Sequence, residues 1–307
     1  MEDYPKNLSE LEKRFATEQA CKDYLFCLRW PDGYKCPRCG HNKIWQMRAG
    51  LYRCVSCDYK GSIISGTIFE GTRKPLVLWF RAIWWVTSQK NGASAKGVQR
   101  ILELGSYQTA WAWLHKLRRA MVRPGRDQLL GTVEVDETYI GGEKPGKRGR
   151  GAIGKTLVAI AVEDKADKGI GRIRLSTIQD ASSASLNTFV QQSIASGSTL
   201  RTDDWAGYSA LKSLGYSHMV VGSTALKLAH LVASLLKRWL MGTHQGAVSP
   251  EHLAYYLDEY AFRFNRRTSN HRGKLFYRLL QNAMDIEPIT YRAMIQNVRG
   301  RNREHKI

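Results

Sequence analysis

Three acidic side chains crowd one short stretch of this sequence, residues 132–142, which reads TVEVDETYIGG. Glu134, Asp136 and Glu137 stand close together, although the whole chain carries 47 Lys and Arg residues against 27 Asp and Glu. Neighbouring carboxylates repel one another unless a positive charge joins them. A solvated strand edge would tolerate these residues, whereas a metal site would explain why they are crowded.

A second pair of acids, Asp203 and Asp204, follows the strand-like run STLRT. The order of elements set out below allows this strand to lie beside the strand that carries Asp136. Because ligand sites form where the strands of an open sheet end, the carboxylates of Asp136 and Asp203 would then converge. Paired carboxylates suit Mg²⁺, and two such ions can hold the attacking and leaving oxygens of a phosphodiester. The pattern predicts a metal site that acts on nucleic acid.

A third metal ligand is expected from residues 226–242, which read as a long helix. No Asp or Glu stands between Lys227 and Met241, but His230 does. Lys237 follows His230 by seven residues, which is two helical turns, so both side chains share one face. A lone histidine on a helix is usually packed or solvated, and that alternative stays open here. The position of His230 in the element order makes it a candidate ligand.

Four of the six cysteines form two CxxC pairs, Cys36 with Cys39 and Cys54 with Cys57, separated by 14 residues. Each pair can offer two thiolates to one tetrahedral ion, and the intervening residues can form a hairpin that brings the pairs together. The spacing predicts one structural Zn²⁺ ion. Two redox dithiols are the alternative, but they would need a thioredoxin-like βαβ pattern, and none is visible.

The net charge of the chain is formally +20, which favours a polyanionic partner, most commonly nucleic acid. A membrane surface is the alternative, but basic residues occur along the whole chain rather than on one amphipathic segment. The sequence starts without a secretory signal, and Arg81 interrupts its most apolar window. We therefore expect a soluble intracellular protein with no membrane partner.

The region before residue 127 reads as helical, apart from the cysteine pairs. A capping box at Ser9–Glu12 predicts a helix that ends near the turn RWPDG at residues 29–33. Further on, two helices separated by a short break at residues 103–105 give a helix-turn-helix layout, with the second helix starting at Ser106. A helical hairpin with no DNA role would show the same pattern.

Candidate DNA contacts come from three places in this sequence. The first residues of the second helix are where base contacts are usually made. Basic residues around the cysteines suit phosphate contact, although a solvated basic face would look the same, and a basic loop follows residue 142. The candidate DNA-binding residues are Arg38, Lys43, Arg53, Ser106, Tyr107, Gln108, Lys147, Arg148 and Arg150.

Beyond residue 128 the pattern changes to alternating strands and helices. Strands are expected at 132–140, 155–164, 171–180, 198–204 and 217–222, and helices at 181–197, 205–215 and 226–242. This order predicts a mixed sheet covered by helices, of the α/β class.

Residues 149–156, GRGAIGKT, match the phosphate-loop pattern of nucleotide-binding proteins. That loop works only between a strand and a helix that starts at the lysine. Here a basic polar loop precedes the motif and the strand-like run LVAIAV follows it. We therefore expect no nucleotide cofactor, and a loop that touches the DNA backbone is the simpler interpretation.

Several segments of the chain together resemble one known family. They are RWPDG, CPRCG, SGTIFEGTRKPLVLWF, VEVDETYIGG, RTDDWAGY, LLKRWLMGTH and VSPEHLAYYLDEYAFRFNRR, and they occur in the family's order. The chain resembles the DDE-type transposases of prokaryotic insertion sequences, in the group with an N-terminal zinc ribbon and an RNase H-like (ISXO2-like) catalytic domain. The resemblance implies an RNase H-like mixed sheet flanked by helices, preceded by a zinc ribbon and a helix-turn-helix region.

The resemblance also implies catalytic roles. Asp136 and Asp203 fall on the first and second catalytic aspartates, and Asp204 stands where the family usually has glycine. The third position is usually Glu or Asn, seven residues before a Lys, and here it is His230 followed by Lys237. Imidazole binds Mn²⁺ readily but is softer than Mg²⁺ prefers. Glu134 is expected to tune the site or bind a metal-bound water, and Glu137, on the other face of the strand, to be structural.

The implied activity is DNA transposition, with Mg²⁺ or Mn²⁺ as two catalytic ions. The partners would be double-stranded DNA, both element ends and target, and a second copy of the chain, since joining two ends requires at least a dimer. The location would be the prokaryotic cytoplasm, at the nucleoid. A decayed transposase acting as a DNA-binding regulator and an RNase H-like nuclease without strand transfer are the alternatives.

These readings divide the chain into five segments. They are an N-terminal helical segment at 1–33, the zinc ribbon at 34–62, the helix-turn-helix region at 63–127, the catalytic domain at 128–270 and a basic C-terminal tail at 271–307.

Overall fold

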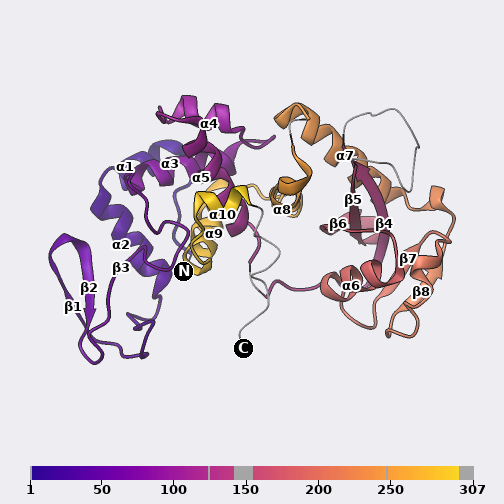
Figure 1. Ribbon diagram of the computed structural model, residues 1–307, viewed down its shortest axis with the longest axis horizontal. Helices are drawn as coiled ribbons and strands as arrows, with labels where there is room; N and C mark the ends of the chain where they lie inside the picture. Colours follow the sequence, from indigo (N-terminus) through magenta and orange to yellow (C-terminus); the bar gives the residue numbers. More distant parts are fainter. Residues whose placement is uncertain (1, 124, 142–154, 247, 297–307) are drawn as a thin grey trace. The chain divides into compact units, whose positions relative to one another are not determined.

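A computed structural model describes residues 2–123, 125–141, 155–246 and 248–296 of the chain. The chain forms two compact units (Figure 1). The first combines residues 1–123 with 269–307, and the second spans residues 124–268. In the described part of the chain, no helix has both the length and the apolar character needed to cross a membrane.

The first unit joins a small antiparallel sheet to a set of helices. The sheet has the order β1-β2-β3, with β1 at Ile44–Gln46, β2 at Leu51–Cys54 and β3 at Lys60–Ser62. The helices are α1 (Leu8–Arg14), α2 (Glu18–Arg29), α3 (Leu76–Ser88), α4 (Ala95–Ile101), α5 (Tyr107–Ala120), α9 (Arg272–Asp285) and α10 (Tyr291–Ile295).

Helix α1 begins one residue before the predicted capping box. The side chain of Asn7, not that of Ser9, accepts the hydrogen bond from the backbone N–H of Glu10 at 2.9 Å. The Glu10 carboxylate accepts in turn from the backbone N–H of Lys6. The N-cap is therefore Asn7, and the arrangement differs from a capping box because Glu10 accepts from Lys6, one residue before the N-cap, rather than from Asn7 itself. The predicted single helix is also two helices, because α2 starts anew with Thr17 as its N-cap.

The predicted basic tail at 271–307 is wrong for its described part, which is folded. Helix α9 packs against α2, α3 and α5. Phe276, on α9, is fully buried and contacts the rings of Phe15, Phe80 and Trp84. Gly273 lets α9 come close to the start of the chain, since a Cβ there would lie 1.7 Å from the carbonyl oxygen of Pro5. The prediction failed because this basic segment also carries the apolar residues of an amphipathic helix.

The second unit is built on one five-stranded sheet with the order β6-β5-β4-β7-β8. The strands are β4 (Thr132–Ile140), β5 (Thr156–Asp164), β6 (Ile170–Ile178), β7 (Thr199–Thr202) and β8 (Ser217–Val220). The first three pair antiparallel, and β7 then pairs parallel to β4, with β8 parallel to β7. The predicted pairing of the first and fourth strands is confirmed. This is the mixed sheet of an RNase H-like fold.

Helices cover both faces of this sheet (Figure 1). On one face, α7 (Lys227–His244) and α8 (Leu253–Phe264) bury Val158, Ile160 and Val162 of β5. On the other face, α6 (Ser183–Ser193) and the short helix η3 (Ala206–Tyr208) cover apolar residues of β4 and β5. Strand β5 is therefore buried on both sides, which explains its unbroken apolar run. The predicted helix at 205–215 is reduced to η3 and turns.

A buried carboxylate, Glu163 at the end of β5, links the strands of this unit. It accepts hydrogen bonds from the side chain and backbone N–H of Arg172, on β6, and from the backbone N–H of Leu130. Burial acts to raise the pKa of Glu163, but these hydrogen bonds outweigh it and lower the pKa to about 2. The ionised carboxylate therefore stabilises the folded unit.

We expect Glu163→Gln to destabilise the second unit at pH 7 by on the order of 3 kcal/mol. The pKa of Glu163 is lower in the folded state than its ordinary value of 4.5, so its contribution is complete above about pH 4.5. The contribution is lost as the pH falls toward 2. Urea unfolding of wild type and variant at pH 7 and pH 3 measures this. A difference between the two proteins that does not shrink at pH 3 would contradict the assignment.

Candidate metal centres

The sequence suggested that Asp136 lies at the end of its strand. In the structure it lies in the middle of β4. Strand β7 pairs with β4 only as far as Glu134, which faces Arg201. Continuing this register by two residues brings Asp203 level with Asp136, where β7 has ended and β4 continues. The two aspartates are therefore neighbours across the end of the parallel pair, as the strand order predicted.

Asp136 faces helix α7, and His230 meets it there. The Nε2 atom of His230 lies 3.2 Å from Oδ2 of Asp136. His230 is half exposed, whereas the Asp136 side chain is only 18% exposed. Burial raises the pKa of Asp136, and the carboxylates of Glu137 and Asp203 act in the same direction, while the backbone N–H of Glu137 and the His230 ring oppose it. A cation bound here would relieve this repulsion.

An open hollow of about 500 Å³ surrounds this pair, and Lys237 and Ser234 line it from the next turns of α7. Burial lowers the pKa of Lys237, and the neighbouring Lys155 adds to this effect, while Asp136 opposes it. His230 and Lys237 thus face the same space, as the helical spacing predicted. A cation and a carboxylate beside one hollow suit a phosphate and a metal ion respectively.

Asp203 lines a neighbouring hollow with Asp204 and Trp205. Its Oδ1 atom accepts a hydrogen bond from the backbone N–H of Trp205 at 3.2 Å. Asp203 is half buried and Asp204 is exposed, which agrees with Asp203 as the inward residue of the two. The structure therefore joins Asp136 directly to His230, and the strand register sets Asp203 level with Asp136.

This spacing decides which kind of metal site the residues could form. Among the described residues, the four cysteines are the one group with ligand atoms all within 4.8 Å of one another. Asp136, Asp203 and His230 are more widely spaced, which does not suit a single shared ion. Two divalent ions held by the three residues together would be compatible with this wider spacing. The donor set, two carboxylates and an imidazole, suits Mn²⁺ and tolerates Mg²⁺.

Glu134 does not point into either hollow, so the expectation that it holds a metal-bound water finds no geometric support. Its side chain is 2% exposed, and its Oε2 atom accepts from the backbone N–H groups of Leu228 and Ala229 at 2.9 and 3.0 Å. Glu137 points to the opposite face, where it accepts a hydrogen bond from the buried Tyr208 hydroxyl at 2.7 Å. Sequence reasoning could not find these partners, because they lie 71 residues or more along the chain.

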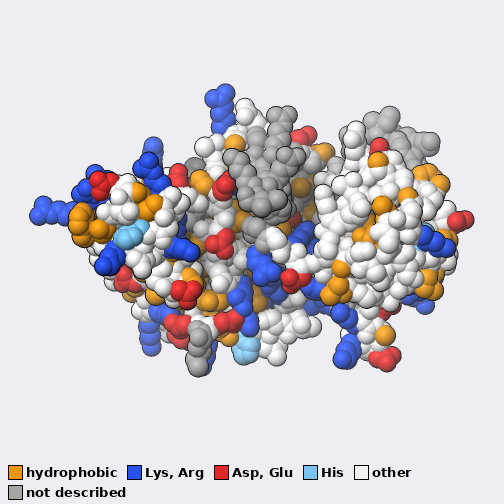
Figure 2. Space-filling view, turned by 90° about the horizontal axis from the view of Figure 1, so that it is seen from below, with side chains coloured by type: hydrophobic (Ala, Val, Ile, Leu, Met, Phe, Trp, Pro, Cys, Tyr) orange, Lys and Arg blue, Asp and Glu red, His pale blue; other side chains and the backbone are white. Residues whose placement is uncertain are grey.

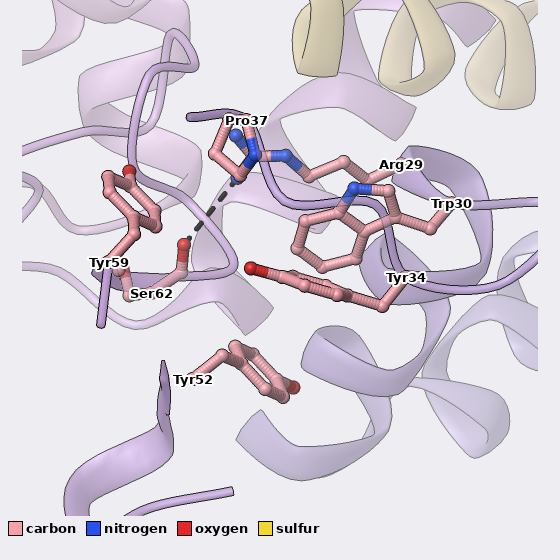
Figure 3. A pocket seen from close by; sticks show the side chains of 8 residues that line it. Arg29, Trp30, Tyr34, Pro37, Tyr52, Tyr59 and Ser62 are labelled. Atoms are coloured by element: carbon pink, nitrogen blue, oxygen red, sulfur yellow. Dashed lines mark hydrogen bonds between the residues drawn. The ribbon is translucent and has the colours of Figure 1, made fainter. Parts of the chain in front are cut away.

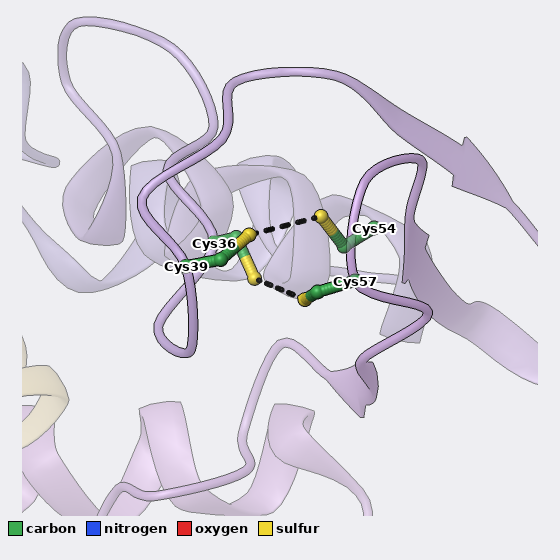
Figure 4. A group of neighbouring side chains, drawn as sticks. All are labelled: Cys36, Cys39, Cys54 and Cys57. Carbon is green, nitrogen blue, oxygen red and sulfur yellow. Dashed lines mark hydrogen bonds between the residues drawn. The ribbon is translucent and has the colours of Figure 1, made fainter.

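The four cysteines of the first unit form a second candidate centre (Figure 4). Cys36 Sγ lies 3.7 Å from Cys57 Sγ, and Cys39 Sγ lies 3.6 Å from Cys54 Sγ. Four sulfurs bound tetrahedrally to zinc at 2.3 Å lie about 3.8 Å apart, so this cluster fits one Zn²⁺ ion. The surrounding sheet is antiparallel and carries no βαβ unit, which removes the redox-dithiol alternative.

Arg29, at the end of α2, holds the zinc ribbon to the helices (Figure 3). Its guanidinium donates to the carbonyl oxygens of Ile63 and Ser65 at 2.6 and 2.7 Å, just after β3. The same group lies over the ring of Trp30, which packs edge-on against Tyr34. These contacts fix the ribbon within the first unit.

The candidate DNA contacts of the helix-turn-helix lie at the start of α5. Helices α4 and α5 pack together across a short turn, as predicted. Tyr107 is 48% exposed and Gln108 is exposed, so both are accessible to a ligand. Ser106 is instead the N-cap of α5, and its Oγ atom accepts from the backbone N–H of Thr109 at 3.1 Å. Its hydroxyl is therefore engaged within the helix.

The candidate contacts of the ribbon are also accessible. Arg38 and Lys43 are exposed, while Arg53 is partly held by Asp58 and lies over the exposed ring of Trp45. Figure 2 shows basic and hydrophobic side chains together at the end of the view that holds β1 and β2.

The remaining DNA-contact candidates, Lys147, Arg148 and Arg150, lie outside the described residues, as does most of the GRGAIGKT motif. Its last residue, Thr156, begins β5, so a strand and not a helix follows the motif. The context that a phosphate-binding loop needs is therefore missing on this side.

Two family models match this chain, one in each unit. Residues 128–265 match the family described as the ISXO2-like transposase domain, and residues 16–60 match the transposase zinc-ribbon domain. A protein of Halobacterium salinarum, described as an uncharacterized protein in transposable element ISH50, is 27% identical over 291 residues. That alignment covers 85% of this chain and 95% of the relative.

Two solved structures show a more distant likeness. One is a simian T-cell lymphotropic virus intasome in complex with PP2A regulatory subunit B56 gamma, at 14% identity and a TM-score of 0.31, covering 58% of this chain and 70% of that chain. The other is the Mos1 transposase paired-end complex with left transposon end, at 15% identity and a TM-score of 0.29, covering 67% and 75%.

Proposed function

Since this chain belongs to the ISXO2-like transposases with an N-terminal zinc ribbon, we propose that it cuts and joins DNA at the ends of its own insertion sequence. The observation that carries this proposal is the contact between Asp136 and His230, with Asp203 level with Asp136 just past the end of the β4–β7 pair. All three residues lie inside the matched transposase domain. The reaction class is hydrolysis followed by transesterification of phosphodiester bonds.

Asp136, Asp203 and His230 would together hold the two divalent ions. Bound there, Mg²⁺ or Mn²⁺ would activate a water or a 3′-hydroxyl as nucleophile and stabilise the leaving oxygen. Lys237 faces the same hollow and would hold a phosphate of the strand being cut. The burial of Asp136 keeps bulk water away from its carboxylate, which strengthens its hold on a cation.

The first unit would supply recognition of the element ends, that is, of their terminal inverted repeats. Tyr107 and Gln108, at the exposed start of α5, would be the leading residues of a recognition helix. Arg38, Lys43 and Arg53 on the zinc ribbon would contact phosphates, as would Lys147, Arg148 and Arg150 beyond β4. Because two ends must be joined, the active form would be a dimer or a larger assembly on DNA.

The test uses the full chain and DNA that carries the flanking inverted repeats of its own gene. We expect cleavage at the repeat boundary with Mg²⁺ or Mn²⁺, followed by joining of the freed 3′ end to a target plasmid. Sequencing of the junctions identifies the product. Cleavage without joining would favour the nuclease alternative. Specific binding with no cleavage under either metal would favour the DNA-binding regulator, because the family resemblance leads one to expect Glu or Asn at the position of His230.

His230 should also set the choice of metal. We expect wild-type protein to cleave about tenfold faster with Mn²⁺ than with Mg²⁺, because imidazole is a softer ligand than a carboxylate. His230→Glu should reduce or reverse that preference, while His230→Ala should lose most activity with both metals. Single-turnover rates at saturating DNA measure this. Equal rates for wild type and His230→Ala would show that the residue is not a ligand.

A further inference from the structure

The long helix α7 begins without a cap of its own. Its N-cap position is Leu226, whose side chain cannot accept a hydrogen bond, and no local side chain caps the first turn. The first backbone N–H groups of a helix need acceptors when they are buried. Ala229, in this first turn, is fully buried, so water cannot serve it. The acceptor must come from another element.

Glu134 of β4 supplies that acceptor. One oxygen, Oε2, accepts from both Leu228 and Ala229, at 2.9 and 3.0 Å. The other oxygen, Oε1, lies 3.7 Å from the guanidinium of Arg201, on the neighbouring strand β7. The same guanidinium donates a hydrogen bond to the carboxylate of Asp164 at 3.3 Å. A carboxylate that is 2% exposed thus joins the positive end of α7 to the sheet.

The strand makes two successive contacts with the helix. Glu134 and Asp136 stand two residues apart on one face of β4. Glu134 binds the backbone of residues 228 and 229, and Asp136 meets the side chain of the very next residue, His230, at 3.2 Å. The contact of Glu134 with the helix backbone fixes both the position of the helix start along the strand and its rotation about the helix axis. A shift of the helix along the strand would break it and would carry His230 away from Asp136.

We propose that Glu134 is a positioning residue, which holds the first turn of α7 in register with β4 and so sets His230 against Asp136. The inference rests on the proposed function for its catalytic meaning, but its structural part can be measured without activity. Glu134 touches no reacting group, so it acts through His230. The acid at this place in VEVDE is therefore a clamp between strand and helix.

The structural test is amide hydrogen exchange on the full chain, resolved to the first turn of α7. In Glu134→Ala we expect the amides of Leu228 and Ala229 to exchange roughly 30-fold faster, because they lose their acceptor. Glu134→Gln keeps one acceptor oxygen and should show a smaller increase. Glu163→Gln is the matched control, since it removes a buried carboxylate of the same sheet that does not contact α7. It should leave these two amides unchanged.

The functional test compares the same variants at saturating end DNA. We expect Glu134→Ala to cleave at least tenfold more slowly, with end-DNA affinity within twofold of wild type, and Glu134→Gln to recover part of the rate. Glu163→Gln should cleave at the wild-type rate below its unfolding temperature.

Each negative result would contradict a different part of the proposal. Unchanged exchange at both amides in Glu134→Gln and Glu134→Ala overturns the clamp, whatever the activity. If Glu134→Ala does not fold, Glu134→Gln decides alone by the same criterion. Faster exchange together with wild-type cleavage rejects the positioning role. If wild type itself does not cleave, the proposed function fails, while the exchange data still decide whether Glu134 holds the helix.

Discussion

Asp136→Asn is expected to slow strand cleavage at the element ends by on the order of 10³-fold, while end binding stays within twofold of wild type. In the proposed site this carboxylate would help to hold the divalent ions. Such ions supply several kcal/mol of transition-state stabilisation, and each 1.36 kcal/mol is worth a factor of ten in rate. Asparagine keeps the shape of the side chain but loses its charge. Single-turnover cleavage and electrophoretic mobility shifts measure the two quantities.

The chain offers a matched control in Asp203 and Asp204. Asp203→Asn should behave like Asp136→Asn, because Asp203 stands level with Asp136 across the β4–β7 pair. Asp204→Asn removes the adjacent, exposed charge and should retain most of the activity. Equal losses at Asp203 and Asp204 would point to a general effect of negative charge. Full activity of Asp136→Asn would remove the proposed site altogether.

The arrangement of the site was predictable where it depends on the order of elements. Asp136 and Asp203 each follow a run of apolar residues, and two further strands and a helix separate the two runs in the sequence. This order of elements is enough to bring the two aspartates to the same end of the sheet. His230 and Lys237 are seven residues apart, so they share one face of any α-helix. These features are local in sequence or follow from topology, so no side-chain partner had to be known.

What could not be predicted depends on partners distant in sequence. Glu134 and Asp136 look alike in VEVDE, yet Glu134 is taken up by backbone amides 94 and 95 residues further on. Nothing in the local pattern distinguishes a carboxylate that caps a helix from one that faces a metal. Helix α9 was missed for a similar reason. Its apolar side chains, such as Phe276, find their partners in helices near the start of the chain.

Loss of zinc is expected to have the largest effect on the first unit. A structural zinc contributes about 10–16 kcal/mol in small zinc domains, which equals or exceeds the whole stability of a typical domain. The short strands β1, β2 and β3 bury little besides Tyr34 and two of the cysteines. Without the ion, this sheet has too small a core to stay folded. Cys54→Ser, at a fully buried ligand, should therefore unfold the ribbon and lose one zinc per chain.

The matched control is Cys27→Ser, which changes an exposed cysteine outside the cluster and should keep its zinc. Elemental analysis of both variants, purified without chelator, gives the metal content. We expect Cys54→Ser to bind end DNA at least 100-fold more weakly. An unfolded ribbon would no longer be held in a fixed position against the helices to which Arg29 joins it. The second unit has its own core on both faces of its sheet, so its thermal transition should persist. Zinc retained at one per chain in Cys54→Ser would contradict the four-cysteine site, and loss of both transitions would show that the two units do not fold independently.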